Sequence, residues 1–290
     1  MSLQSRRRLN LVLVVVVAAL GTLTYFHPHG KRPSRETPLI DFATHDVTDV
    51  RLEDAGKPPL ELKREVTGWW LTAPFAYGAD ANLVQAFLDS LAQAKATPVN
   101  GASKDLDEYG LDKPLVRLGL DSRELAFGAA EPVSGERYVM VNGKVGLVEP
   151  YVFYQATHDA YWWLEKKLLP EGARITALQL PRATLMLDKD ERWQLAPRDD
   201  SVSADAIQLL VNNWQAANAI GLAPIGKGKP LGEVAVILSG MREPLRFQIL
   251  KDPDFLVLAR PDLGLEFQLD QDQEAKLMEF VKPAPAAATH

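Results

Sequence analysis

The sequence predicts an α+β fold, in which an N-terminal transmembrane helix precedes two tandem repeats of one mainly antiparallel β-sheet unit. Each repeat is expected to carry a packed helix after its third strand and a closing helix. Three observations support this: one long apolar run, several stretches of alternating apolar and polar residues, and a duplicated stretch. That stretch reads WWLTAPFAYGAD at 69–80 and RWQLAPRDDSVSAD at 192–205. A spacing of about 120 residues indicates duplicated domains, since solenoid repeats are much shorter.

Composition limits the possible function classes. The 290-residue chain is 47% hydrophobic and 24% charged, the balance of a globular protein with room for two domains. Residues 1–36 carry a net charge of +5 and residues 37–290 one of −11, which together give −6. An acidic body repels phosphate backbones, so nucleic acid is not an expected partner. The lack of cysteine excludes disulfides, thiolate metal sites and cysteine nucleophiles.

The apolar run begins at Leu9, directly after three arginines, and ends at Phe26. Its 18 residues would span about 27 Å as a helix, close to the ~30 Å of a hydrocarbon core. We therefore expect attachment to the bacterial inner (cytoplasmic) membrane through Leu9 to Phe26. The rest of the sequence holds no second apolar span, so the body should lie in the periplasm or outside. The alternative is a cleavable signal peptide, which the length of the run disfavours.

These features divide the chain into six predicted segments. They are a cytoplasmic basic tail (1–8), a transmembrane helix (9–26), a stalk (27–38), a first α+β repeat (39–168), a second α+β repeat (169–282) and a disordered tail (283–290).

The elements of the first repeat follow from periodicity. Alternation predicts strands at 47–52 and 60–65, and Pro74 ends a third strand at 69–73. Asp80 is placed to cap a helix, because apolar residues recur at helical spacing after it. Thr97-Pro98 is expected to end that helix. Four more strands are predicted at 116–120, 124–127, 138–141 and 144–148, and a closing helix near 151–166.

The second repeat is aligned on the duplicated stretch. Trp70 corresponds to Trp193, Pro74 to Pro197 and Asp80 to Asp205. In this interpretation the tryptophans are core residues on a strand, the prolines end that strand, and the aspartates cap the helix that follows. Four further strands are predicted at 234–238, 245–249, 255–260 and 265–269, before a closing helix near 271–281.

One motif points to a known family. YGLDKP, with Tyr109, Gly110 and Pro114, lies between a predicted helix and strand, and LAFG and RYVMVNGKVGLVEP follow it. With WWLTAP upstream, this combination resembles an uncharacterised bacterial family, domain of unknown function 4340, over most of residues 40–282. The second repeat reads IGKGKP instead, so the motif is not carried over there.

The resemblance implies a location and an architecture. Family members look like N-terminally anchored extracytoplasmic proteins, and some are similar to products encoded beside gliding-type ABC-transporter components. No catalytic residues are established for the family, so the resemblance implies none in this chain.

The residues themselves indicate no catalytic, cofactor-binding or metal site. GLAPIGKG at 221–228 nearly spells a phosphate-binding loop, but Gly228 stands where a Ser or Thr is needed, and the segment runs from helix to strand. No HExxH or GxSxG motif occurs, although a fold could bring a serine to His45 or His158. Acidic clusters at 105–112, 188–191 and 270–274 are interpreted as solvated turns, with a cation site or an acid/base pair as the alternative.

Aromatic residues concentrate between the two repeats, in YVFYQATHDAYWWLEKKLLP at 151–170. Tyr151, Tyr154, Tyr161 and Trp162 are the candidates for a partner-binding or inter-repeat surface, because Tyr and Trp dominate interface energetics. The alternative is that this segment only packs one repeat on the other.

We therefore expect a single-pass membrane-anchored protein that acts outside the cytoplasm as a non-enzymatic binding or scaffold subunit. Its partners would be membrane or envelope proteins, as an accessory to a transporter or envelope complex, and no cofactor is expected. The alternatives are a periplasmic hydrolase and a small-ligand-binding protein with its site between the repeats.

Overall fold

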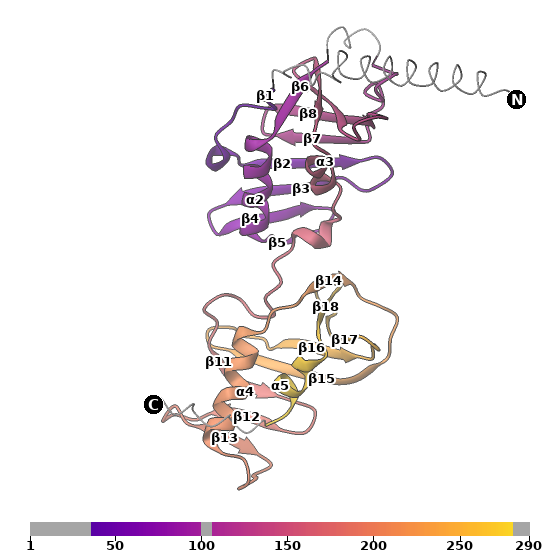
Figure 1. Cartoon of the computed structure of the whole chain (residues 1–290). Helices are drawn as coiled ribbons and strands as arrows, with labels where there is room; N and C mark the ends of the chain where they lie inside the picture. Colours follow the sequence, from indigo (N-terminus) through magenta and orange to yellow (C-terminus); the bar gives the residue numbers. More distant parts are fainter. Residues whose placement is uncertain (1–35, 100–105, 281–290) are drawn as a thin grey trace, which may run out of the picture.

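The computed structural model describes residues 36–99 and 106–280, which form two antiparallel β-sheets (Figure 1). The first sheet has ten strands and the second eight, and the described residues contain only four α-helices. The predicted fold class is therefore wrong. The described part of the chain is mainly antiparallel β-sheet rather than α+β, because strands continue where longer helices were expected.

Part of that prediction concerned a transmembrane helix. In the described ranges, 36–99 and 106–280, no helix combines the length and the apolar composition that crossing a membrane requires. Residues 9–26 lie outside the described residues, as do the predicted tails at 1–8 and 283–290. Thr37 and Pro38, which were expected in the stalk, form β1 (Thr37–Pro38) and pair with β6 (Lys95–Pro98).

The first unit consists of the ten-stranded sheet with two α-helices. Its strands lie in the order β1-β6-β10-β9-β8-β7-β2-β3-β4-β5. The remaining bounds are β2 (Asp49–Asp54), β3 (Leu60–Glu65), β4 (Gly68–Ala73), β5 (Tyr77–Gly78), α2 (Ala81–Gln93), β7 (Val116–Leu120), β8 (Arg123–Ala130), β9 (Arg137–Val141), β10 (Lys144–Val148), α3 (Pro150–Ala156) and the 3-10 helices η1 (Thr44–Asp46) and η3 (Ala160–Trp163).

The second unit consists of the eight-stranded sheet with two α-helices. Its bounds are β11 (Ile175–Gln179), β12 (Thr184–Leu187), β13 (Trp193–Ala196), α4 (Ala204–Ala216), β14 (Gly221–Pro224), β15 (Pro230–Leu238), β16 (Leu245–Leu250), β17 (Phe255–Arg260), β18 (Leu265–Asp270) and α5 (Asp272–Met278). Its order, β14-β18-β17-β16-β15-β11-β12-β13, repeats strand for strand the order from β6 to β4 in the first sheet. The two units therefore share one topology.

A β-bulge in β4 changes which tryptophans of the two units correspond. The pairing of β3 with β4 shifts register and leaves Thr72 without a partner, whereas β12 and β13 pair without a shift. Thr72 therefore has no counterpart in β13, and the residues of β4 before Thr72 align with β13 one position differently from the residue after it. Trp69 corresponds to Trp193, and Trp70 corresponds to Gln194.

The prediction that Trp70 is a core residue is wrong for the same reason. Alternation along β4 buries Trp69, which is 5% exposed, and turns Trp70 to the opposite face, where it is 36% exposed. The Trp70 indole Nε1 donates to Thr67 Oγ1 at 3.1 Å. Trp193 is half-buried against the core of the second unit. Pro74 and Pro197 directly follow the last residues of β4 and β13.

The helix caps require a second correction. Asp80 caps α2, since its carboxylate accepts from the backbone N–H groups of Asn82 and Leu83. In the second unit the cap of α4 is Ser203, whose hydroxyl accepts from Ala206 N at 3.2 Å, and Asp205 lies inside the first turn. Both helices have 13 residues, and each follows its proline at the same distance.

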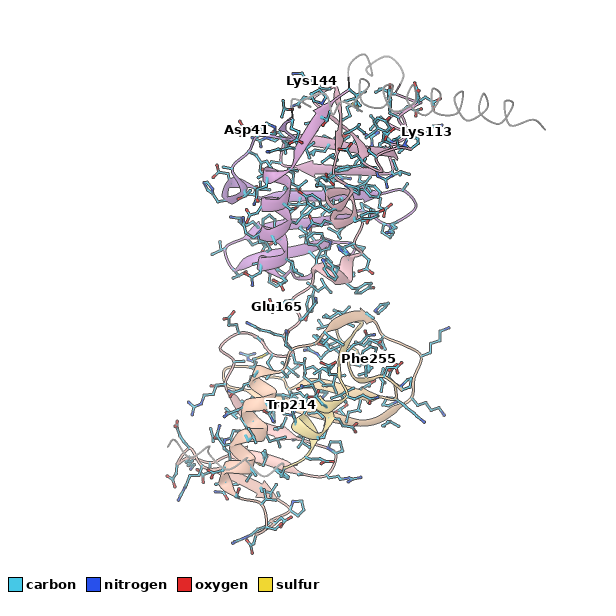
Figure 2. The ribbon with its side chains drawn as sticks, viewed as in Figure 1. Asp41, Lys113, Lys144, Glu165, Trp214 and Phe255 are labelled. Atoms are coloured by element: carbon cyan, nitrogen blue, oxygen red, sulfur yellow. The ribbon has the colours of Figure 1, made fainter. Side chains whose placement is uncertain are left out.

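The helices and their sheets enclose the main core. Val84, Phe87, Leu88 and Leu91 are the buried stripe of α2, as their helical spacing predicted. In the second unit Trp214 of α4 packs near Phe247 of β16, and its indole donates to the backbone carbonyl of Leu277 (Figure 2). The core therefore lies on one face of each sheet.

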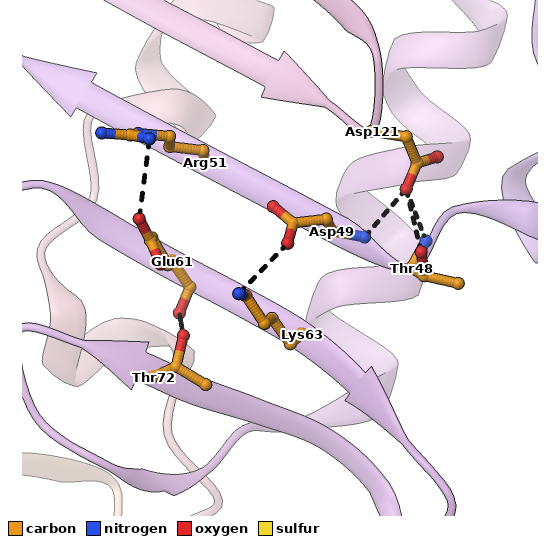
Figure 3. A network of polar contacts seen from close by, with 7 residues as sticks. All are labelled: Thr48, Asp49, Arg51, Glu61, Lys63, Thr72 and Asp121. Atoms are coloured by element: carbon orange, nitrogen blue, oxygen red, sulfur yellow. Dashed lines mark hydrogen bonds and ion pairs between the residues drawn. The ribbon is translucent and has the colours of Figure 1, made fainter.

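The other face of β2 to β4 is polar (Figure 3). Arg51 contacts Glu61 at 3.8 Å, and Lys63 contacts Asp49 at 3.6 Å. Asp121 accepts from the backbone N–H groups of Thr48 and Asp49. The charged side chains of this face pair with one another across the strands, so this face is the solvated side of the sheet.

Four segments differ from the expected elements. The helix expected to end at Thr97-Pro98 ends at Gln93, and Thr97 and Pro98 belong to β6. The first four residues of GLAPIGKG form the edge strand β14, and residues 225–228 continue without regular secondary structure. The closing helices α3 and α5 have seven residues each, and Asp159 starts a separate 3-10 turn where α3 was expected to continue.

A candidate binding site at the junction of the two units

The aromatic segment between the units folds as two short helices. Pro150 at the first position starts α3, and Thr157 ends it by donating its hydroxyl to the carbonyl of Tyr154 at 2.8 Å. Asp159 then caps η3, accepting from the backbone N–H of Trp162 at 3.1 Å. These two caps break the segment, so its rings point in different directions.

Adjacent tryptophans have opposite environments. Trp163 is 1% exposed and packs edge-on against Phe87 of α2, with ring centroids 5.2 Å apart. Trp162 is 43% exposed, and its ring lies flat on His158, at a centroid distance of 4.1 Å and an interplanar angle of 10°. The ammonium of Lys166 lies 5.1 Å from the Trp162 centroid. Trp162 is thus held in place by stacking while 43% of it stays exposed.

Two hollows flank the His158–Trp162 stack. One, of about 220 Å³, is lined by the stack together with Lys166 and by Ile220 and Leu222 of the second unit. The other, of about 200 Å³, lies on the side of the first unit and is lined by His158 and Lys57 but not by Trp162. Both are smaller than the ~300–1,000 Å³ of typical small-molecule pockets. Each hollow has room for single side chains rather than for a typical small molecule.

Burial sets the charge of the stack. It lowers the pKa of His158 below its ordinary value, while Asp159 opposes this change and Lys57 adds to it. His158 is therefore mainly neutral at pH 7. Lys57 donates to the Thr157 carbonyl at 3.2 Å and pairs with Asp54 at 2.6 Å, so it also braces the end of α3.

The linker strand, residues 163–168, is bonded to both units. Asp80 N donates to the carbonyl of Trp163, and Glu165 N donates to that of Gly78 in β5. On the other side Ala219 N donates to the Lys166 carbonyl, at 2.8 Å. Glu165 marks the passage between the units in Figure 2. Backbone hydrogen bonds therefore attach the start of the linker strand to the first unit and its end to the second.

Charged and aromatic groups also meet at the junction. Arg260, the one buried charged side chain in the described ranges, donates to both carboxylate oxygens of Asp262 at 2.9 and 2.7 Å. Burial raises the pKa of Tyr77 in β5, Arg260 lowers it, and Glu165 and Asp262 raise it. Tyr77 of the first unit thus lies within the electrostatic reach of an ion pair of the second, in which Arg260 is buried and Asp262 is exposed.

The four candidate aromatic residues do not form one surface. Tyr151 and Tyr154 of α3 are exposed, and Trp162 is exposed beside the hollows. Tyr161 is half-buried and packs against Phe75, with centroids 5.4 Å apart. The sequence pattern missed Ile220, since only the fold brings the second unit's chain beside η3, and it did not indicate that His158 stacks on Trp162.

The YGLDKP motif has a structural position away from the junction. The carbonyl of Tyr109 accepts from Ala129 N at 2.8 Å, Gly110 has a φ of +64°, and Leu111 is buried. Tyr109 also packs against Tyr138, with centroids 4.6 Å apart. The motif covers the outer face of β8 to β10, and Pro114 follows as the chain enters β7.

The other polar clusters show no catalytic arrangement in the described ranges. No group of three or more His, Asp or Glu could hold a metal there, and neither His45 nor His158 accepts a serine hydroxyl proton. Asp188 organises a hairpin, because its carboxylate accepts hydrogen bonds from the backbone N–H of Arg192 and from the Gln194 amide. The same bonds lower the pKa of Asp188 below its ordinary value. Of the three acidic clusters, this one is a structured turn.

Residues 69–224, more than half of the chain, match the family described as Domain of unknown function (DUF4340). The chain belongs to this family. The DUF4340 match runs from β4 to β14, so it includes α2, the aromatic segment, the linker strand and α4. No curated protein and no solved structure matches the chain.

Proposed function

We propose that this DUF4340 protein is a non-enzymatic binding subunit that recognises a protein partner through the His158–Trp162 stack and the hollows beside it. The observation that carries the proposal is the exposed, stacked Trp162 at the junction. A large ring that is already immobilised loses little conformational entropy on binding, which is why such residues form interface hot spots.

The setting of the ring supports a protein partner. Ile220 and Leu222 of the second unit line the same hollow as the stack, so apolar side chains lie beside Trp162. Asp159 and Lys166 supply a polar rim. An apolar centre with a polar rim is the usual composition of a protein–protein interface.

The proposal includes a cellular setting. The apolar segment from Leu9 to Phe26 would attach the chain to the cytoplasmic membrane, with the two units outside the cytoplasm. The partner would then be a subunit of a transporter or another envelope complex. The apolar composition of the segment and its flanking arginines support this setting.

The experiment compares two tryptophans of similar exposure. Full-length chains carrying Trp162→Ala or Trp70→Ala are expressed at the native level, cross-linked in cells and purified with their partners. We expect a stoichiometric partner with the parent chain and with Trp70→Ala, and at least a tenfold loss with Trp162→Ala, as for a hot-spot residue. Equal recovery with both variants would contradict the proposed site.

A further inference from the structure

The two units differ at one edge of their sheets. In the first unit β5 closes the outer edge of β4, pairing Tyr77 with Leu71 and Gly78 with Trp70. The equivalent strand of the second unit, β13, ends its sheet, and in the described ranges it pairs only with β12. One unit thus carries its own edge strand and the other does not.

The missing strand has a local cause. The segment that follows Pro197 forms a turn, in which the Asp199 carboxylate accepts from Ser201 N at 2.9 Å and from Ser201 Oγ at 2.6 Å. Val202 N also donates to the Asp199 carbonyl. These bonds hold the segment away from an extended course along β13.

The register shows which groups of β13 face outward. Asp188 N donates to the Arg192 carbonyl, and antiparallel pairs alternate, so Gln194 and Ala196 bond to β12. The backbone N–H and C=O groups of Trp193 and Leu195 then point away from the sheet. They form a short template for another strand.

We propose that this template pairs with β13 of a second copy of the chain, antiparallel and around a two-fold axis at Gln194. Trp193 of each copy would face Leu195 of the other, which gives about four new backbone hydrogen bonds. Both side chains are half-buried and belong to the core face, so pairing would cover the apolar surface that they still expose.

Charges at the ends of the strand support a second copy as the occupant. Arg192 pairs with Asp190 at 2.7 Å at one end, and Arg198 pairs with Asp200 at 2.7 Å at the other. The strand itself is uncharged. A two-fold axis brings one exposed Arg–Asp pair against the other, so each arginine gains a second carboxylate nearby. The short strand implies a weak, reversible dimer.

The experiment uses the absence of cysteine in the parent chain. Gln194→Cys introduces a single thiol in the full-length protein, and the two-fold pairing places two such positions about 4.5 Å apart, within disulfide range. We expect mild oxidation to give a covalent dimer. Met186→Cys is the control, because Met186 is exposed on the neighbouring strand β12 but would lie roughly 14 Å from its counterpart.

A second variant tests pairing without a disulfide. Gln194→Lys places like charges at the axis and should lower dimer formation about fivefold in sedimentation experiments. Because this change also removes the hydrogen bond from Gln194 to Asp188, thermal unfolding checks that the variant is folded at the temperature of the measurement. The inference is overturned if Gln194→Cys cross-links no better than Met186→Cys. The double variant Gln194→Cys with Ala286→Cys tests whether the chain's own tail occupies the edge instead. The inference is equally overturned if its two thiols form an intramolecular disulfide in place of the dimer.

Discussion

At the scale of single residues, Gly128 decides how the YGLDKP segment docks. A Cβ at this position would lie far inside contact distance of the Tyr109 carbonyl oxygen, and it would also press on the Leu111 side chain. The carbonyl cannot move away freely, because it accepts from Ala129 N. The small residue in β8 is therefore a steric requirement for covering the outer face of the first sheet.

We predict that Gly128→Ala lowers the free energy of unfolding by about 3 kcal/mol, through backbone overpacking. Gly119→Ala is the matched control on neighbouring β7, since its Cβ would make an ordinary 3.5 Å contact with Arg51 Cβ. That change should stabilise the chain by less than about 1 kcal/mol. Urea unfolding measures both, and equal effects would refute the steric explanation.

The cap of α4 gives a second residue-scale prediction. Ser203→Ala removes the side chain that accepts from Ala206 N and should cost about 1 kcal/mol of unfolding free energy. Asp205→Ala should cost only about 0.3–0.5 kcal/mol, because Asp205 interacts with the helix dipole without capping. A larger loss from Asp205→Ala in thermal unfolding would restore the sequence alignment of Asp80 with Asp205.

At the scale of elements, the linker strand is the connection that sets the junction. Its backbone bonds reach Gly78 and Asp80 in the first unit and Ala217 and Ala219 in the second. A flexible linker would leave its amides bonded to water. This one extends the edges of both units, which places Trp162 and Ile220 on the same hollow.

We predict that the amide protons of Glu165 and Ala219 exchange slowly with solvent, because each is hydrogen-bonded to a backbone carbonyl, that of Gly78 and that of Lys166 respectively. Hydrogen exchange followed by NMR or mass spectrometry measures this protection. Exchange at the rate of an unstructured peptide would show that the linker is free and the units are not fixed.

Particular elements show what the sequence could predict. The apolar stripe of α2 and the Asn142-Gly143 turn between β9 and β10 follow from local periodicity and turn chemistry. The bulge at Thr72 does not, because an extra residue is tolerated by the backbone pairing and leaves no composition signal. It misaligned Trp70 with Trp193, which reversed the predicted face of Trp70.

The candidate site was only partly predictable for a related reason. Aromatic composition identified the segment around Trp162, since exposed Tyr and Trp are typical of interfaces. Composition could not show that Trp163 turns inward and Trp162 outward, which depends on the cap at Asp159. Nor could it indicate Ile220, which reaches the hollow only through the linker strand and β14.

At the scale of the whole molecule, one topology occurs twice, and the differences between the copies lie at their edges. The first unit closes its edges with β1 and β5 and covers its outer face with the YGLDKP segment. The second unit lacks these additions in the described ranges and contributes Ile220 to the junction. The copies therefore have the same fold and different surfaces available for binding.

The central claim is that Trp162 is covered by a partner in the cell. Oxidative footprinting measures this directly, by comparing the oxidation rates of Trp162 and Trp70 in the purified full-length chain and in native membranes. We predict that the Trp162 rate falls at least fivefold in membranes while the Trp70 rate stays the same, because only Trp162 lies in the proposed interface. Equal rates for Trp162 in both samples would contradict the account.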